Sequence, residues 1–235
     1  NHPSGMAYYK ADNTVYFAMC DVWNSRVLIY KGSSVEAAVK ADPVVVLGQD
    51  DFTSAKPGYG LNQMNYPMDC AVDGSGNLIV SDSHNNRLLI FEDIAQIAEN
   101  EASGVAADYE VGWFMTDHTT NSSRIINPWG VNIENVDGVD KMIVGNLGNH
   151  CILIWNNLPD TWAEFSDTDV YTENYYPDLV LSLEVGSTPR SITWSGKQLI
   201  VGDENIHNSD GSIKSCFRVF NGFPSVESID KKISR

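Results

Sequence analysis

Short apolar runs alternate with polar clusters rich in Gly, Asn and Asp along the chain. The apolar runs are rich in β-branched and aromatic residues, and this composition is typical of β-strands that turns connect. Two stretches, residues 33–41 and 93–102, have instead the spacing of a helix, and both follow an apolar run. The pattern predicts an all-β protein in which helices are short excursions between strands.

The strand-like runs recur in a repeat of about 60 residues. Each repeat opens with a similar heptad that starts at a proline, and these prolines are Pro3, Pro67, Pro128 and Pro189. A second run ends in an acid or an amide, at Asp21, Asp82, Asn146 and Asp203. A third run closes on an aromatic residue, at Tyr30, Phe91, Trp155 and Phe220. The recurrence predicts three equivalent strands in each repeat.

A fourth apolar run is present in the first three repeats. The fourth repeat lacks this run and carries an insertion of about eight residues after Asp203, in a loop, where repeats accept insertions. Four short strands per unit, repeated radially, are typical of a β-propeller, and a β-sandwich with accidental similarity is the alternative. The repeat favours the propeller. The expected blades are approximately residues 1–64, 65–126, 127–187 and 188–235.

The second repeat resembles the NHL-repeat propellers. Residues 65–91 follow the family order of Pro, apolar strand, Asp-Gly-x-Gly-Asn turn, apolar strand, Asp, Asn-Arg and apolar strand. Residues 44–52 and 60–67 are similar to the link between blades in bacterial members. Repeat three departs from the pattern, with Asn146 for the acid and Cys151 for the arginine.

The resemblance implies a propeller with about four NHL-type blades in this chain. Members of the family are commonly six-bladed, so we expect the chain to be part of a larger ring, or an incomplete ring. Either the chain is a fragment of such a propeller, or another copy of the chain or a partner completes the ring.

The charge of the chain excludes two classes of partner. There are 15 Lys+Arg against 31 Asp+Glu, a formal net charge of -16 at pH 7. A surface of this charge repels nucleic-acid phosphates and anionic lipids. We therefore expect no nucleic-acid binding. We also expect no membrane insertion, because no apolar run is long enough to span a bilayer. The expected partner is a protein or a polysaccharide, and the expected location is extracellular or periplasmic.

Two repeats place an acid and an arginine on either side of a short loop, Asp21 with Arg26 and Asp82 with Arg87. Across such a loop the carboxylate can accept from loop amides while the guanidinium reaches a carboxylate. We interpret both as structural turn pairs that hold a corner of the blade.

Three histidines follow the acid or amide of repeats two, three and four, at His84, His150 and His207. The position of His150 and His207 is similar to that of zinc-binding histidines in the peptide-amidating lyases, which have propeller folds. Three imidazoles that converge on a central channel would bind zinc and leave one position open for water or substrate. Solvated loop histidines without a metal are the alternative.

Acidic loops at residues 134–140 and 207–212 could supply oxygen ligands to calcium, although Asp-Gly turns between strands need no ion. The chain contains no Gly-x-Ser-x-Gly, no Gly-x4-Gly-Lys-Ser/Thr and no His-Glu-x-x-His sequence. The usual signals for nucleophilic and nucleotide-driven chemistry are therefore missing. Calcium and zinc are the two cofactors that remain open.

Loop residues are the candidates for binding. Trp23 occupies the loop position that His84 occupies in the next repeat, Asn86 follows in the same loop, and Trp129 begins an inner strand. Exposed aromatic rings on a loop face stack on sugars or anchor a protein partner. The leading hypothesis is a non-catalytic propeller that presents its loops to a protein or polysaccharide.

Two alternatives remain. One is a metal-dependent propeller lyase or hydrolase with a histidine-lined channel. The other is an assembly subunit that pairs through an open sheet edge, because unpaired strand edges are readily extended by another chain. The disulfide state of the four cysteines (Cys20, Cys70, Cys151 and Cys216) is also open.

Overall fold

The computed structural model describes residues 2–112, 125–158, 162, 177–183, 186–207 and 213–224. Four antiparallel sheets make up this part of the chain, and in each sheet the strands lie side by side in chain order. The first sheet contains β1 (Pro3–Ala11), β2 (Thr14–Asp21), β3 (Arg26–Gly32) and β4 (Val45–Leu47). The second contains β5 (Pro67–Val72), β6 (Leu78–Asp82), β7 (Arg87–Phe91) and β8 (Tyr109–Gly112).

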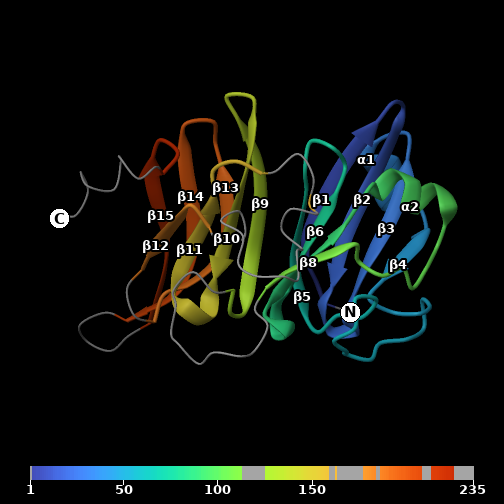
Figure 1. Cartoon of the computed structure of the whole chain (residues 1–235), viewed down its shortest axis with the longest axis horizontal. Helices are drawn as coiled ribbons and strands as arrows, with labels where there is room; N and C mark the ends of the chain where they lie inside the picture. Colours follow the sequence, from blue (N-terminus) through green and yellow to red (C-terminus); the bar gives the residue numbers. More distant parts are fainter. Residues whose placement is uncertain are drawn as a thin grey trace.

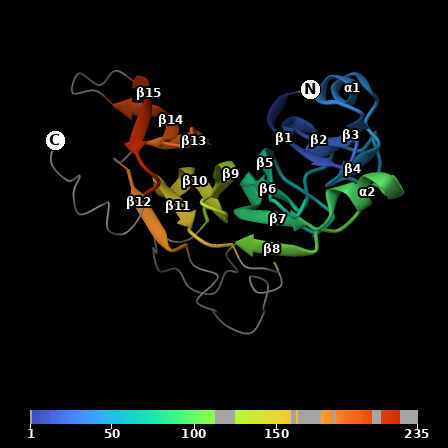
Figure 2. The same ribbon diagram turned by 90° about the horizontal axis from the view of Figure 1, so that it is seen from above.

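The third sheet contains β9 (Pro128–Val136), β10 (Val139–Asn146), β11 (Cys151–Trp155) and β12 (Leu179–Ser182). The fourth contains β13 (Thr188–Trp194), β14 (Gln198–His207) and β15 (Ile213–Asn221), so that three strands form it within the described residues. The sheets stand side by side (Figure 1). Seen from above they form an arc, with β1, β5, β9 and β13 on the inner side (Figure 2). This is the arrangement of β-propeller blades, and it confirms the fold expected from the repeat.

The two stretches with helical spacing form the helices α1 (Val35–Lys40) and α2 (Ile94–Asn100). Ser34 caps α1 by accepting from the backbone N–H of Ala37 at 3.1 Å, and Asp93 caps α2 in the same way. Each helix follows the third strand of its sheet. Within the residues that the structure describes, no helix is long and apolar enough to span a bilayer.

The hydrophobic core is divided into layers, each between two successive blades. The layer between blades 1 and 2 contains Ala18 and Val27 from one sheet and Leu78 and Phe91 from the next. Comparable layers lie between blades 2 and 3 and between blades 3 and 4. Every sheet inside the arc is therefore apolar on both faces, which explains why its strands are continuous apolar runs.

The innermost strands pack closely because small residues face the neighbouring blade. A Cβ atom on Gly130 in β9 would lie 2.3 Å from the carbonyl oxygen of Arg190 in β13. A Cβ atom on Gly5 in β1 would lie 2.3 Å from the Cα of Asp69 in β5. Glycine at these positions lets the inner ends of the blades converge.

Candidate functional site

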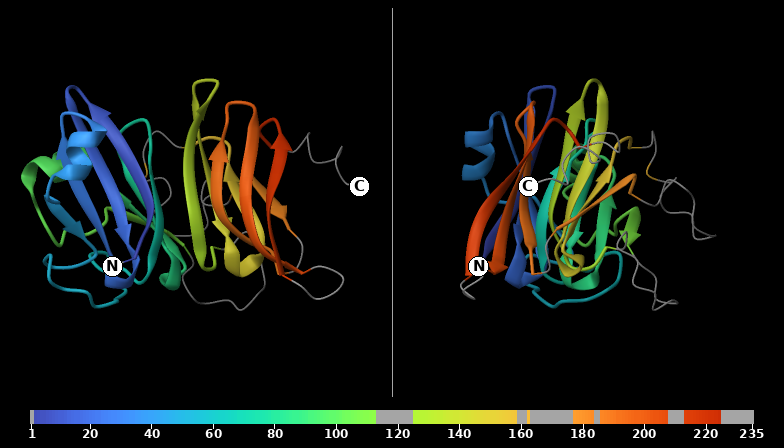
Figure 3. Two further views of the ribbon diagram at one scale, coloured as in Figure 1. Left: turned by 180° about the vertical axis from the view of Figure 1, so that it is seen from behind. Right: turned by 90° about the vertical axis from the view of Figure 1, so that its left-hand side faces the viewer.

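Each of the first three blades turns from its second to its third strand through a short 3-10 turn at the same end of the sheets. These turns are η1 (Val22–Asn24), η2 (Ser83–Asn85) and η3 (Leu147–Asn149). Each turn ends in a residue with left-handed backbone, namely Ser25, Asn86 and His150 with φ of 51°, 57° and 52°. The end of the sheets that carries these turns also carries the N-terminus (Figures 1 and 3). We call it the loop face.

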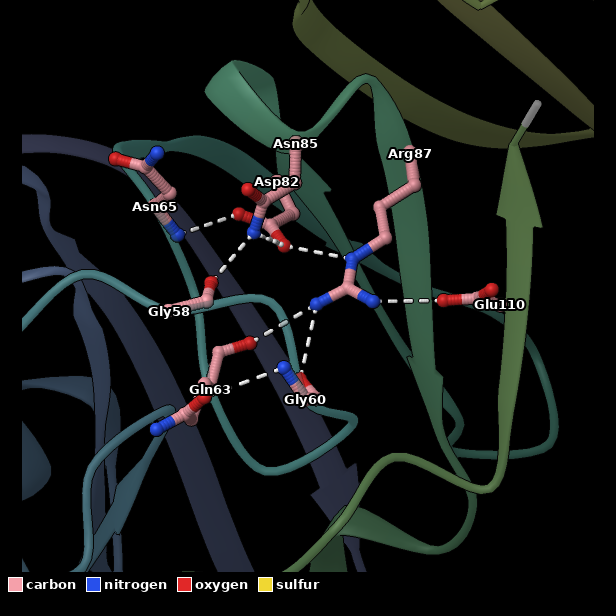
Figure 4. Close-up of polar contacts among 8 residues, drawn as sticks. All are labelled: Gly58, Gly60, Gln63, Asn65, Asp82, Asn85, Arg87 and Glu110. Carbon is pink, nitrogen blue, oxygen red and sulfur yellow. Dashed lines mark hydrogen bonds and ion pairs between the residues drawn. The ribbon is translucent and has the colours of Figure 1, made fainter. Parts of the chain in front are cut away.

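Asp82 is the centre of the blade 2 corner (Figure 4). Its Oδ2 accepts from the Nε of Arg87 at 2.8 Å and from the Nδ2 of Asn85 at 2.7 Å. Its Oδ1 accepts from the backbone N–H of Asn65 at 2.7 Å. The Asp82 side chain is fully buried and that of Arg87 is 2% exposed. Burial raises the pKa of Asp82, and the Asn65 N–H and the Arg87 charge oppose that rise.

The rest of the Arg87 guanidinium holds the linker between blades 1 and 2. Its Nη2 donates to the carbonyl oxygens of Gly60 at 3.0 Å and Gln63 at 3.1 Å, and its Nη1 donates to Glu110 in β8 at 2.7 Å. The guanidinium also lies over the ring of Tyr59, 4.4 Å from the ring centroid. The corner of blade 2 therefore fixes the linker as well as the turn (Figure 4).

The equivalent corner of blade 1 is more open. Arg26 donates from Nε to Asp21 at 2.9 Å and from Nη1 to the carbonyl oxygen of Phe52 in the same linker. Burial raises the pKa of Asp21, but hydrogen bonds from Asn24 and Arg26 outweigh this and hold the pKa below its ordinary value. Both arginines of the turn pairs thus reach the linker that follows β4.

Blade 4 has the same ion pair in a different register. Arg218 donates from Nε to Asp203 at 2.5 Å and from Nη2 to Ser187 at 3.0 Å. Asp203 lies opposite Cys216 in the ladder, so Arg218 is two residues farther along β15 on the same face. The insertion hides this pair in the sequence. Side chains two residues apart in a strand lie on the same face, so a count of two from Cys216 leads to Arg218.

Blade 3 has a neutral corner. Asn146 accepts from the backbone N–H of Ile126 at 2.7 Å through Oδ1 and donates to the Sγ of Cys151 at 3.4 Å. Repeat three therefore keeps an oxygen that accepts from the backbone, the Oδ1 of Asn146, but has neither the negative nor the positive charge of the Asp82–Arg87 pair.

Exposed rings lie on the loop face of blades 1 and 2. Trp23 is 61% exposed and stacks on His2, with ring centroids 5.0 Å apart. His84 is exposed and stacks on Tyr66 with centroids 4.4 Å apart and an angle of 11° between the rings. The linker adds Tyr59, which is also exposed. Sequence reasoning missed Tyr59, together with Phe52, because it treated the linker as a connection only.

The other two predicted binding residues make internal contacts. Asn86 accepts from the backbone N–H of Asn127 at 2.8 Å and so joins blade 2 to the start of blade 3. Trp129 is partly buried, and the guanidinium of Arg190 lies 4.3 Å from its ring centroid. The structure therefore brings Trp23 and His84 to the loop face and places Trp129 on an inner strand.

The histidines differ in their surroundings. The Nδ1 of His150 donates to the carbonyl oxygen of Ser187 at 2.6 Å, since a carbonyl can only accept. The side chain of His207 lies outside the described residues. Among the residues that are described, no group of three or more His, Cys, Asp or Glu is placed to hold a metal ion.

The first acidic loop takes part in contacts between turns. Asp140 accepts from the backbone N–H of Gly74 at 3.1 Å and from the Nδ2 of Asn135 at 2.8 Å. The second acidic loop, residues 207–212, lies almost wholly outside the described residues. A polar cavity of about 280 Å³ next to Asp140 is also lined by Asp73 and Trp162. Trp162 closes one wall by donating from Nε1 to Asp73 at 2.9 Å.

Asp69 is a further titratable group, on the inner strand β5. Burial raises its pKa to about 7, and the backbone N–H groups of Val131 and Cys70 oppose the rise. The two N–H groups donate to the carboxylate at 3.2 Å and 2.9 Å. No disulfide joins the four cysteines, all of which lie within the described residues.

No family model and no curated protein matches the chain. Solved structures are similar to it at low identity. A 6-phosphogluconolactonase-like protein from Bacteroides uniformis is 13% identical with a TM-score of 0.49, over 96% of this chain and 58% of its own. Virginiamycin B lyase from Staphylococcus aureus is 11% identical with a TM-score of 0.43, over 91% and 55%.

Hsv2 from Kluyveromyces lactis is 11% identical with a TM-score of 0.44, over 90% of this chain and 60% of its own. The chain thus spans little more than half the length of these structures. The propeller class rests on the strand order and the arc of sheets described above. At this level of similarity the neighbours do not distinguish a binding module from an enzyme.

Proposed function

We propose that this chain is a binding module of the NHL-repeat type that takes a protein or polysaccharide partner on the loop face of blades 1 and 2. The observation that carries the proposal is the set of exposed rings there, each backed by a second flat group. His2 lies under Trp23, Tyr66 lies against His84, and the Arg87 guanidinium lies against Tyr59.

Rings that are held in place lose little conformational freedom when they bind, so more of their contact energy appears as affinity. Flat, rigid and partly polar side chains are also those that dominate binding interfaces. The charged groups next to them are already occupied, since Arg87 and Asp82 are buried against one another and against the linker. Support for a binding role therefore comes from the rings and not from the polar corner.

The NHL-type assignment within the proposal rests on the repeat itself. Blades 1, 2 and 4 have an acid and an arginine at the same corner, and blade 3 has a neutral equivalent. An extracellular or periplasmic location belongs to the same proposal.

The proposal is tested with neutral soluble polysaccharides in native affinity gels and with displayed peptide libraries. Trp23→Ala and Tyr59→Ala should each weaken retention or capture at least about 10-fold, as expected for the loss of a central ring. Val139→Ala is the control, because Val139 is an exposed apolar residue in the hairpin between β9 and β10, at the opposite end of the sheets. Equal losses in all three variants, or no loss in the first two, would contradict the proposal.

A metal-dependent lyase or hydrolase is the runner-up. The hydrogen bond from His150 Nδ1 to the Ser187 carbonyl supports it, because metal-binding imidazoles are commonly oriented by such a bond. Zinc content of the purified protein, measured with and without His150→Ala, tests this alternative. Stoichiometric zinc that the substitution removes would favour it over the binding module.

A further inference from the structure

We propose that Cys20 and Cys70 are an oxidation site, at which an oxidant that is itself a disulfide converts the two thiols into a bond between blades 1 and 2. Cys20 lies near the end of β2 in blade 1, and Cys70 lies in the inner strand β5 of blade 2. Both side chains belong to the apolar layer between these blades, where they are 0% and 3% exposed. The two residues are 50 positions apart, so the bond closes a long segment of the chain.

The two thiol groups face each other across this layer. Side chains two residues apart in a strand lie on the same face, so Ala18 and Cys20 both face blade 2. The Sγ of Cys70 lies 4.0 Å from the carbonyl oxygen of Ala18, which places it against β2. A hydrogen bond between their side chains joins Cys70 to Cys20. The thiols are therefore adjacent in the folded chain.

The backbones of the two blades also approach closely at this point. Cys20 lies opposite a bulge of β1 that contains Gly5. A Cβ atom on Gly5 would lie 2.3 Å from the Cα of Asp69, which precedes Cys70 in β5. The Cα atoms of β2 and β5 also come within 8 Å of each other. Since a disulfide requires Cα atoms no more than about 7 Å apart, this close approach is the geometry that it needs.

A metal ion is the other use for two facing thiols. Structural zinc takes four ligands, so it would need two more here. The neighbouring carboxylate of Asp69 already accepts from the backbone N–H groups of Val131 and Cys70. Within the described part of the chain, no three His, Cys, Asp or Glu side chains are grouped to hold a metal ion. The surroundings therefore favour a bond between the two sulfurs.

The reaction is thiol–disulfide exchange. One of the two thiols loses its proton, and its thiolate attacks a sulfur of the oxidant, so that a mixed disulfide forms and one thiolate leaves. The second protein thiolate then attacks the mixed disulfide, which forms the bond between Cys20 and Cys70 and releases the other thiolate. The protein loses two protons and two electrons, and the oxidant takes up both as it becomes two thiols.

Burial determines when this exchange takes place. The contact with Cys70 and burial both raise the pKa of the Cys20 thiol, so the reactive thiolate is scarce in the folded state. The sulfurs are also closed off from an oxidant in solution. We therefore expect the bond to form as the chain folds, before blades 1 and 2 close on each other, and to resist reductants afterwards.

The experiment is refolding of the whole chain from urea in a mixture of reduced and oxidised glutathione, followed by alkylation of the remaining thiols and peptide mass mapping. We expect the map of the wild-type chain to contain the bond between Cys20 and Cys70. The matched controls Cys151→Ala and Cys216→Ala should keep this bond, whereas Cys20→Ala and Cys70→Ala should have only free thiols. A refolded wild-type chain in which all four cysteines are alkylated, or a disulfide that persists in Cys20→Ala, would overturn the inference.

A second measurement separates a bond that fits the native fold from one that forms only in the unfolded chain. A fitting disulfide restricts the unfolded chain, so the Tm of the oxidised protein should exceed that of the reduced protein by at least about 5 °C. The double variant Cys20→Ala/Cys70→Ala should have the same Tm under both conditions. An equal or lower Tm for the oxidised wild-type chain would show that the bond strains the fold and would count against the proposal. Neither measurement uses a ligand, so both are independent of the proposed binding role.

Discussion

Replacement of Arg87 with cysteine should be among the most destabilising single changes in this chain. The change removes the Nε partner of the buried Asp82 carboxylate and two hydrogen bonds to the linker, at Gly60 and Gln63. Loss of one member of a buried ion pair costs about 3–5 kcal/mol, because the remaining charge has no partner. Asp82 keeps its bonds from Asn65 and Asn85, so we expect the lower part of that range.

The matched control is Arg26→Cys in blade 1. There the arginine side chain is 15% exposed and that of Asp21 is 8% exposed, so water can partly solvate the remaining carboxylate. We expect a cost of about 2 kcal/mol, between that of an exposed pair and that of a fully buried one. Urea unfolding followed by tryptophan fluorescence gives both free energies, and equal costs in the two blades would refute the reasoning.

Blade 3 supplies a rescue. The double variant Asp82→Asn/Arg87→Cys reproduces the Asn146 and Cys151 corner, which is neutral and buried. It still lacks the linker contacts but leaves no uncompensated charge, so it should recover about 1–2 kcal/mol relative to Arg87→Cys. The pKa of Asp82 is already raised by burial, so in Arg87→Cys it should rise further and the lost stability should partly return as the pH falls.

Asp69 should make the folded state less stable as the pH rises. The folded state holds the Asp69 proton up to a pKa of about 7, whereas the ordinary pKa is 3.8. The free energy of unfolding should therefore fall as the pH rises from about 4 to about 7, by at most about 4 kcal/mol. Asp69→Asn should therefore flatten the dependence of urea stability on pH in that window, and an unchanged slope would argue against the shift. Gly130→Ala should cost more than about 2 kcal/mol, because its Cβ would lie 2.3 Å from a backbone oxygen, whereas Gly202→Ala, whose Cβ has its first neighbour at 3.4 Å, should cost far less. Thermal unfolding of the two glycine variants side by side tests this difference.

The strands and helices could be predicted from the sequence because local signals agree with the fold. The heptad at Pro67 and the turn at residues 73–77 together fix where β5 ends and β6 begins. In the helices, Ser34 and Asp93 stand just before short apolar stretches, where a capping residue is expected. Each of these signals depends on residues close together in the chain.

The site was harder to predict because its contacts join residues far apart in the chain. Tyr59 lies 28 positions before the arginine whose guanidinium it contacts, and nothing in its own neighbourhood indicates that contact. The partner of Asp203 was hidden for a related reason, since an insertion moved Arg218 out of the expected register.

The corner pairs connect the scaffold to the proposed binding face. A turn alone would be satisfied by a neutral acceptor, as Asn146 shows in blade 3. Arg26 and Arg87 do more, because one outer guanidinium nitrogen of each donates to carbonyl oxygens of the linker between blades 1 and 2. That linker carries Phe52 and Tyr59. If the rings bind a partner, Arg87→Cys should weaken binding even under conditions where the variant remains folded, while the charge-neutral double variant should recover stability without recovering affinity.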